Sequence, residues 1–351
     1  MSGKTTTYHI IGGGIAGLAA ARFIKEASLD NKVILYEAAG KLGGRCYSFF
    51  DAKLDRMIDN ATHVILGGNK EVLKLINEPQ FAGRAKFFDD DGINSRFWDY
   101  KDHILLSVFN TQGKETAPSL VRRLFWKLFP FWPQRLNVCY SKGDLTAGLV
   151  DPLSRYIDEI KLGYTLQGFN STKKKITKLK FNKGEIELGT SDKIIAALDA
   201  ANYGKIFGGE EFEFNRITNI FFRTSTALSL PGEADFLATP KNTADWIFIN
   251  NDIVAATISD SGRIPLEDDE LARVVWQEIR ALKGLKPAFL PPYRIMHYKQ
   301  ATIKQDETNN NKRPKSAKSK YKNLRLAGDW TMKGWPCCLE AAVMSAKRAV
   351  K

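Results

Sequence analysis

The sequence predicts an α/β protein in which a Rossmann-type domain is interrupted by a second domain of mixed sheet and helices. Three observations support this fold class. A glycine-rich turn separates a short strand from a helix near the N-terminus, an acidic residue ends the next strand, and a Gly-Asp pair precedes the last helix. The 351 residues are 44% hydrophobic and 26% charged, as expected of a globular protein with one large domain or two ordinary ones.

The first strand is expected over residues 7–11, and the glycine-rich turn follows it directly. Gly12 permits the tight turn, and Gly14 lets the backbone approach a pyrophosphate. Gly17 lets the following helix pack closely on the strand. This arrangement is typical of dinucleotide-binding turns.

The helix after this turn is expected over residues 15–28 and begins with Ile15 and Ala16. Its N-terminus offers N–H groups and the positive end of the helix dipole to phosphates. The next strand, 33–36, ends at Glu37, whose carboxylate can accept hydrogen bonds from ribose hydroxyls. Strand, turn, helix and acid together predict a bound dinucleotide.

A second glycine pair, Gly43-Gly44, follows this strand and is itself followed by Arg45. The glycines allow close backbone approach, and the planar guanidinium can hold phosphate oxygens. Nicotinamide-binding domains do not usually carry this extension, whereas flavoproteins of the glutathione-reductase-like class do. The predicted cofactor is therefore FAD.

The C-terminal residues supply the third part of the predicted site. A buried strand over 324–327 leads into Gly328 and Asp329, and a last helix begins near residue 338. In this flavoprotein class the Gly-Asp pair binds the ribityl and phosphate region, and the last helix directs its N-terminus at the flavin. Leu339, in the first turn of that helix, is included among the predicted cofactor-binding residues.

Several segments resemble the FAD-dependent amine oxidase and phytoene desaturase superfamily, of the amine-oxidase-type fold. The closer resemblance is to its squalene-associated branch, the hydroxysqualene dehydroxylase family found beside hopanoid biosynthesis. The segments are 58–69 with Asp-Asn-Ala-Thr-His, 244–248 with Asp-Trp-Ile-Phe, 301–305 with Ala-Thr-Ile-Lys-Gln, and 328–340 with Gly-Asp-Trp-Thr. The first two are the more specific, because the wider superfamily shares the glycine and Gly-Asp-Trp motifs.

The resemblance implies an FAD-dependent oxidoreductase that removes the hydroxyl group of hydroxysqualene and releases squalene, an isoprenoid lipid. Such a reaction needs an apolar tunnel, a proton donor and an electron donor, which the sequence does not identify. Asp59 and His63 are the candidate catalytic residues, because either can transfer a proton near the flavin. The structural alternatives are a capping carboxylate for Asp59 and a buried, backbone-bonded histidine for His63.

The chain departs from the family pattern between Phe88 and Tyr100, where members carry a longer helical section of the substrate domain. The departure leaves two other functions open. One is an FAD-dependent amine oxidase or a carotenoid or phytoene desaturase-like enzyme, and the other is a flavin-binding lipid carrier without turnover.

The expected domains alternate along the chain. The predicted FAD-binding domain comprises residues 1–75, 139–200 and 322–351, and the substrate domain comprises 76–138 and 201–321. Within the second FAD-binding segment we expect a helix over 151–161 and a hairpin over 176–189.

The net charge of +13 requires an acidic partner or an anionic surface to be considered. Residues 116–143 contain no acid and several aromatic side chains, which predicts either a helix in a membrane interface or a substrate-domain helix with solvated charges. We expect a cytoplasmic protein at the inner face of the membrane. The basic run 312–322 predicts a flexible loop, with a role at anionic lipid as the alternative. No nucleic-acid-binding module and no metal-ligand spacing of cysteines and histidines is present in the sequence.

Overall fold

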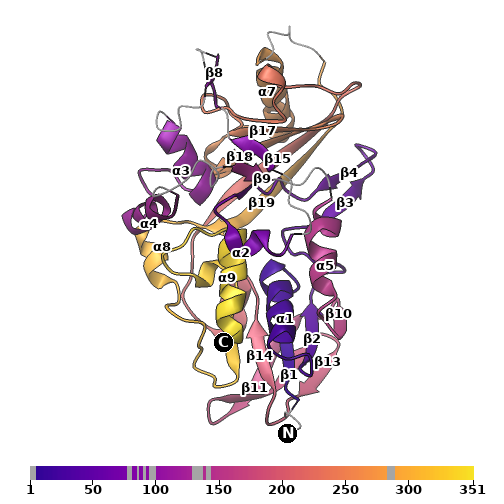
Figure 1. Cartoon of the computed structure of the whole chain (residues 1–351), viewed down its shortest axis with the longest axis vertical. Coiled ribbons are helices and arrows are strands. Elements are labelled where there is room, and N and C mark those ends of the chain that lie inside the picture. Colours follow the sequence, from indigo (N-terminus) through magenta and orange to yellow (C-terminus); the bar gives the residue numbers. More distant parts are fainter. Residues whose placement is uncertain are drawn as a thin grey trace.

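The computed structural model describes residues 5–76, 81–84, 87–89, 92–94, 100–128, 137–139, 144–282 and 289–351. Figure 1 shows two halves stacked along the long axis of the molecule, each built around a sheet. Both halves contain segments that are far apart in the sequence.

The lower half is organised around a five-stranded parallel sheet of order β10-β2-β1-β14-β20. Its strands are β1 (Thr7–Ile11), β2 (Lys32–Glu37), β10 (Glu159–Leu162), β14 (Lys193–Ala196) and β20 (Leu324–Leu326). The inner strands are almost continuously apolar, as expected of a parallel sheet that is covered on both faces. The predicted α/β fold of Rossmann type is confirmed.

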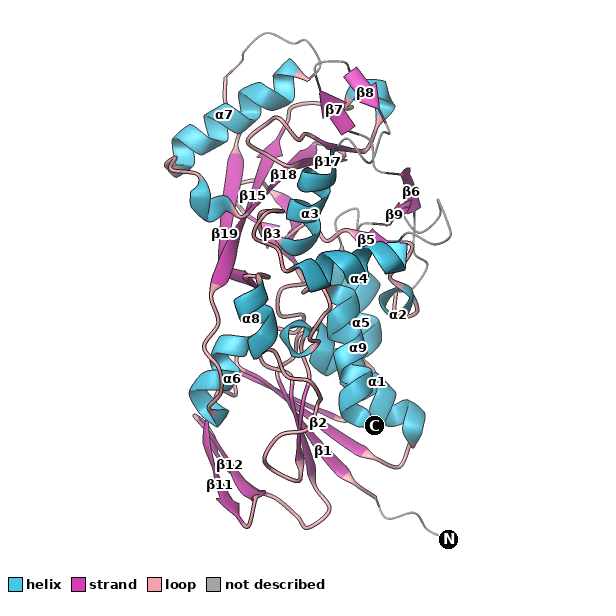
Figure 2. Cartoon of the chain, turned by 90° about the vertical axis from the view of Figure 1, so that its left-hand side faces the viewer, coloured by secondary structure: helices cyan, strands magenta, loops and turns pink. Residues whose placement is uncertain are grey.

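Two different layers cover this sheet, as Figure 2 shows. On one face lie α1 (Ile15–Ala27), α5 (Asp151–Ser154) and α9 (Leu339–Val350), and buried alanines on α1 and α9 let these two helices pack closely. On the other face lie the antiparallel strands β11 (Leu166–Thr172), β12 (Lys175–Phe181) and β13 (Gly184–Glu187), with α6 (Ala200–Phe207) beside them. Tyr36 of β2 stacks on Phe181 of β12, with ring centroids 4.5 Å apart.

The upper half contains a seven-stranded sheet of order β19-β15-β18-β17-β16-β7-β8. Its strands are β7 (Phe87–Asp89), β8 (Gly92–Asn94), β15 (Phe214–Arg223), β16 (Phe236–Ala238), β17 (Trp246–Asn250), β18 (Ile253–Ser259) and β19 (Tyr293–Ile303). Helix α7 (Asp268–Ala281) buries an apolar stripe on one face of this sheet. The hairpin of β3 (Ser48–Asp51) and β4 (Arg56–Asp59) contributes Leu54 and Ile58 to the apolar cluster on the other face.

The remaining elements are shorter. They are β5 (Ile65–Leu66), α2 (Lys70–Leu73), β6 (Phe81–Arg84), α3 (Lys101–Phe109), α4 (Pro118–Leu128), β9 (Asn137–Cys139), the π-helical η3 (Thr146–Val150), η4 (Pro231–Glu233), η5 (Ser261–Arg263), α8 (Glu307–Lys312) and η6 (Asp329–Thr331). Within the described part of the chain, no helix combines the length and the apolar character needed to cross a membrane.

One sequence-based expectation about local structure was wrong. The helix expected over 151–161 ends at Ser154, and 159–162 instead form the edge strand β10. The basic run 312–322 forms a loop after the end of helix α8, and most of its lysines are exposed, but Arg313 is buried. The hairpin expected over 176–189 is present as β12 and β13. Most of the section between Phe88 and Tyr100 lies outside the described residues.

Candidate flavin site

The two predicted glycine turns lie against each other at the carboxyl ends of β1 and β2. The Gly43 N–H donates to the Gly13 carbonyl over 2.8 Å, and Gly14 pairs with Gly43 in a parallel bridge. Gly44 has a φ of 61°, and a Cβ on it would lie 3.0 Å from the Gly14 Cα. Ligands of open parallel sheets bind at this edge, so the turns form one side of a nucleotide site.

The glycines of the first turn are required for two different steric reasons: at Gly12 and Gly17 there is no room for a side chain, and at Gly14 the absence of one leaves open space. A Cβ on Gly12 would lie 2.5 Å from the Ala197 carbonyl oxygen, and a Cβ on Gly17 would lie 2.0 Å from the Gly12 carbonyl oxygen. Neither position can hold a side chain. At Gly14 the nearest atom to such a Cβ is the Gly44 Cα at 3.9 Å, so the space there is open. An open space beside an uncapped helix N-terminus fits a pyrophosphate.

Glu37 ties the end of β2 to the first glycine turn. One carboxylate oxygen accepts a hydrogen bond from the Gly13 N–H at 2.7 Å, and the other accepts one from the Ala39 N–H at 2.8 Å. Each oxygen retains a second lone pair for a ribose hydroxyl. Ile15 and Ala16, predicted beside the phosphates, form the buried first turn of α1.

Arg45 and Asp329 join the N-terminal and C-terminal parts of the site. Arg45 Nη2 lies 3.2 Å from Asp329 Oδ1, and Arg45 Nη1 donates to the Ala301 carbonyl. The Asp329 carboxylate raises the pKa of Arg45. We predicted that Arg45 holds phosphate oxygens; its partners here are Asp329 and Ala301, and through them it links the second glycine turn to β19.

The C-terminal side of the site is built from Gly328, Asp329 and the start of α9. Gly328 has a φ of 130°, and its N–H donates to the Ser345 Oγ of α9 at 2.7 Å. Leu339 opens α9 and packs against the core that α1 shares with this helix. No side chain caps the N-terminus of α9. A helix end of this kind stabilises negative charge placed before it.

The predicted catalytic residue Asp59 makes structural contacts. Asp59 Oδ1 accepts hydrogen bonds from Ser48 Oγ at 2.7 Å and from the Leu145 N–H at 3.0 Å. The carboxylate is 8% exposed and joins the β3–β4 hairpin to the residue before η3. These contacts correspond to the capping alternative.

His63, the other predicted catalytic residue, contacts the segment that follows the second glycine turn. Its Nε2 lies 3.0 Å from the Arg45 carbonyl oxygen and 3.4 Å from the Cys46 Sγ. Burial lowers the pKa of His63, but the Cys46 sulfur and the Arg45 carbonyl outweigh burial and raise it to about 9. His63 is therefore protonated at neutral pH and can act as an acid.

Sequence reasoning missed the residues that surround His63. The Asn60 amide donates to the Arg45 carbonyl at 2.9 Å, and the Tyr298 hydroxyl of β19 donates to the Asn60 carbonyl at 2.6 Å. Burial raises the pKa of Tyr298, so this hydroxyl stays protonated. Asn60 lies in the segment 58–69 that carried the resemblance, but no local signal indicated Tyr298.

Gln305 ends the segment 301–305 that resembles the family, and sequence analysis assigned it no role. Its fully buried amide donates to the Phe109 carbonyl at 2.7 Å and accepts from the Cys337 N–H at 2.9 Å. Gln305 thus connects helix α3 to the chain just before α9.

Burial raises the pKa of Cys337 to about 12, so this cysteine is an unreactive thiol at neutral pH.

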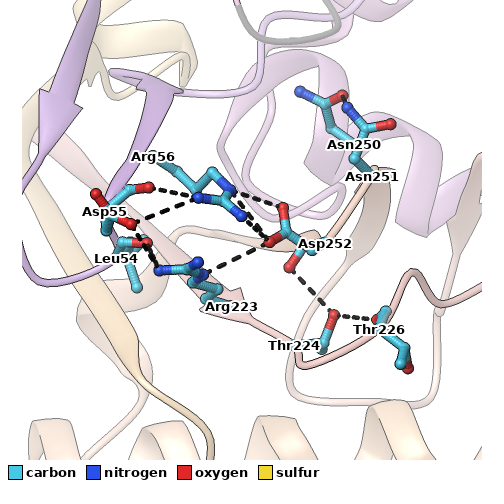
Figure 3. Close-up of polar contacts among 9 residues, drawn as sticks. All are labelled: Leu54, Asp55, Arg56, Arg223, Thr224, Thr226, Asn250, Asn251 and Asp252. Carbon is cyan, nitrogen blue, oxygen red and sulfur yellow. Dashed lines mark hydrogen bonds and ion pairs between the residues drawn. The ribbon is translucent and has the colours of Figure 1, made fainter.

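A charged network holds the β3–β4 hairpin to the upper sheet (Figure 3). Arg56 binds both carboxylate oxygens of Asp252, which lies in the turn between β17 and β18, with the shortest distance 2.7 Å. Arg223 at the end of β15 lies 3.3 Å from Asp55 and 3.5 Å from Asp252. The network fixes the hairpin to the end of β15 and to the turn between β17 and β18.

Comparison with known families defines the class of protein. Residues 10–79 match the NAD(P)-binding Rossmann-like domain, and residues 159–351 match the flavin containing amine oxidoreductase family. The second match spans more than half of the chain, which therefore belongs to the flavin containing amine oxidoreductase family. The chain is an FAD-dependent oxidoreductase, and its open glycine space, the acid at the end of β2 and the Gly-Asp pair fit this cofactor.

The chain is similar over almost its whole length to curated bacterial proteins. It is 28% identical to the hydroxysqualene dehydroxylase of Zymomonas mobilis over 97% of both chains. It is 25% identical to the hydroxysqualene dehydroxylase of Sinorhizobium fredii over 97% of this chain and 96% of the relative. The predicted resemblance is confirmed.

Solved structures share the fold at low sequence identity. Cyclohexylamine oxidase from Brevibacterium oxydans superimposes with a TM-score of 0.71 at 11% identity, covering 99% of this chain and 98% of that one. A putative protoporphyrinogen oxidase from Exiguobacterium superimposes with a TM-score of 0.69 at 15% identity, covering 99% of this chain and 98% of that one. These similarities show the architecture alone.

Proposed function

We propose that this chain removes the hydroxyl group of hydroxysqualene reductively and releases squalene and water. The observation that carries the proposal is the full-length similarity to hydroxysqualene dehydroxylases, in a chain whose glycine turns fit FAD. In this reaction a carbon–oxygen bond breaks and a carbon–hydrogen bond forms, so each turnover consumes one hydride and one proton. FAD, when bound and reduced, supplies the hydride. A separate electron donor must therefore reduce the flavin between turnovers.

His63 is the proposed proton donor to the departing hydroxyl group. A hydroxide is a poor leaving group, and protonation lets it leave as water. His63 suits this role because it is charged at neutral pH and lies beside the segment that follows the second glycine turn. The Arg45 carbonyl fixes Nε2, and the Asn60 amide shares the same carbonyl.

Asp59 is proposed to hold this region in place rather than to transfer the proton. Its Oδ1 already accepts hydrogen bonds from Ser48 Oγ and from the Leu145 N–H, so the side chain ties the β3–β4 hairpin to the start of η3. Tyr298, on β19 of the upper sheet, is proposed to orient Asn60, because its hydroxyl donates to the Asn60 carbonyl.

Peripheral contact with an anionic membrane, at its cytoplasmic face, is a further part of the proposal. Helix α4 exposes Arg122, Arg123, Phe125 and Trp126, and Trp126 is 72% exposed. Its apolar side, with Leu120 and Val121, packs inward. An exposed pair of aromatic side chains among cations suits a bilayer interface from which an isoprenoid is drawn. Further aromatic residues of the segment 116–143, Phe129, Phe131 and Trp132, lie outside the described residues.

The membrane contact is tested by flotation with vesicles that contain anionic lipid. Wild-type protein is expected to float with these vesicles, and Trp126→Glu is expected to remain at the bottom of the gradient. Leu29→Glu is the matched control, because Leu29 is 82% exposed and lies in the turn between α1 and β2. Equal flotation of both variants would contradict a role for α4.

The catalytic proposal is tested with FAD-loaded, chemically reduced protein, mixed anaerobically with hydroxysqualene in detergent. Flavin reoxidation and squalene formation are measured in the same sample and are expected to occur in equal amounts. Stable reduced flavin without squalene would contradict the proposal. In a second sample, oxygen consumption with amines tests the amine oxidase alternative.

A further inference from the structure

Arg313 is a buried cation beside the predicted flavin site. It directly follows helix α8, and its side chain is the largest among the fully buried ones of the described residues, with 2% exposure. A buried guanidinium is costly because it loses its hydration. Its retention in the core therefore requires specific partners.

The partners of Arg313 are three backbone carbonyls of one short segment, 329–335. Nε donates to the Trp330 carbonyl at 3.0 Å, Nη2 to the Asp329 carbonyl at 2.8 Å, and Nη1 to the Trp335 carbonyl at 2.6 Å. The guanidinium is planar and presents its donors in a fixed fork, so one side chain holds both ends of the segment.

The charge of Arg313 has no acidic counterpart nearby. No carboxylate in the described parts of the chain lies within 4.0 Å of its guanidinium, and the Asp329 carboxylate is paired with Arg45. The three carbonyls give each guanidinium nitrogen of Arg313 a hydrogen-bond partner but do not neutralise its charge. A full positive charge therefore remains in a region shielded from water, where its field is weakly screened.

A second cation approaches the same segment from α9. Arg348 Nη2 donates to the Thr331 carbonyl at 2.7 Å, and its Nε is buried without a hydrogen-bond partner in the described structure. Burial and the charge of Arg313 both lower the pKa of Arg348, which indicates that the two guanidinium groups lie within electrostatic reach of each other.

The segment that these arginines hold connects two parts of the flavin cradle. It begins with Asp329, directly after Gly328, and it ends shortly before α9 begins at Leu339. Asp329 in turn is paired with Arg45 of the second glycine turn. A displacement of this segment would separate the C-terminal side of the cradle from the N-terminal side.

We propose that Arg313 is a positioning residue that holds segment 329–335 in the shape required for FAD and that its unneutralised charge raises the reduction potential of the bound flavin. Reduction adds negative charge to the flavin, and a fixed cation nearby favours the more negative state. This inference rests on FAD as the cofactor and is independent of hydroxysqualene as the substrate.

Two variants of the FAD-loaded protein separate positioning from charge. Arg313→Lys keeps the charge but has no planar fork, and Arg313→Met has neither. Both are expected to bind FAD at least tenfold more weakly, because carbonyls of the segment lose their donors. Arg313→Met alone is expected to lower the equilibrium constant for two-electron flavin reduction about tenfold, a potential about 30 mV more negative.

The measurements are FAD affinity by fluorescence titration and flavin potential by reduction alongside a reference dye. Arg325→Met is the matched control, because it removes the same charge from a side chain of β20 that donates to the carbonyls of Lys322 and Leu324, outside the segment 329–335. Wild-type affinity in both Arg313 variants would overturn the positioning role. Equal potentials in the Met variant and wild type would overturn the charge effect.

A third variant covers the case in which Arg313→Met does not retain FAD. Arg348→Met leaves Arg313 and its three hydrogen bonds in place and removes the neighbouring charge. It is expected to shift the flavin potential in the same negative direction by a smaller amount. An unchanged or more positive potential would overturn the charge effect. None of these measurements uses the lipid substrate, so failure of the dehydroxylation assay does not affect them.

Discussion

The two sides of the flavin cradle are held by different physical means. On the N-terminal side, the turns at 12–17 and 43–44 are shaped by backbone crowding, and a Cβ at Gly17 would lie 2.0 Å from a carbonyl oxygen. On the C-terminal side, the segment 329–335 is held by the guanidinium of Arg313, which lies 16 to 22 residues earlier in the chain. Crowding leaves a glycine pattern in the sequence, whereas donation from one residue of a basic run leaves no pattern that distinguishes it from its neighbours.

The largest expected effects concern the glycine side. Gly17→Ala is expected to abolish folding, because its Cβ would overlap the Gly12 carbonyl oxygen. Gly14→Val is expected to fold but to lose FAD, because its side chain would fill the open space assigned to the pyrophosphate. Thermal unfolding and the ratio of flavin to protein absorbance separate the two outcomes. Gly40→Ala is the control, since a Cβ there meets nothing within 4 Å. Stoichiometric FAD in the Gly14 variant would show that the cofactor site is misplaced.

His63→Gln tests the chemistry between these two sides. The variant is expected to lower kcat by about 10²–10⁴-fold, the contribution typical of general acid catalysis, without loss of FAD. Squalene formation in single-turnover experiments measures it. His297→Gln is the matched control, because His297 is hydrogen-bonded to Thr218 and Asp268 in the upper half of the molecule. Equal rates in the two variants would exclude His63 as the donor.

The Cys46 sulfur is expected to set the pH range of activity. With a pKa of about 9, His63 is charged below this pH and loses its proton above it, so kcat/KM is expected to fall as the pH rises through 9. Cys46→Ser removes the sulfur that raises this pKa, and the fall is then expected at a lower pH. Profiles of kcat/KM for both proteins measure the shift. An unchanged profile would show that the sulfur does not control the titration.

The smallest effect is expected for the charged network of Figure 3. Its side chains are partly exposed to solvent, whereas Arg313 is buried. Asp252→Asn breaks its pairing with Arg56, but both side chains contact solvent and are screened by salt. The Tm is expected to fall by only a few degrees, and the difference is expected to vanish at high salt. A large decrease in Tm that persists at high salt would mean that the network contributes substantially to the stability of the fold.

Much of the glycine-rich part of the lower half could be predicted from the sequence, because the residues that define it lie close together along the chain. The strand, the glycine turn and the acid Glu37 follow one another within one unit of the chain. Gly17 is required by the nearby Gly12 carbonyl, and Glu37 bonds to the Gly13 N–H. The strand β10 was missed because 151–161 read as one helix, whereas pairing with β2 converts its last residues into an edge strand. Tertiary pairing outweighed local propensity there.

The sequence by itself determined the fold class, the glycine turns, the acid at position 37 and the flavin cofactor, because these depend on residues that are close along the chain. The tertiary structure alone decided that Arg313 is a buried cation and not part of a solvated loop. It also decided that Cys46 contacts His63 and that Tyr298 reaches Asn60 from the other half. A side chain's burial and its distant partners depend on how the elements pack, and packing is a property of the whole fold that no short stretch of sequence contains.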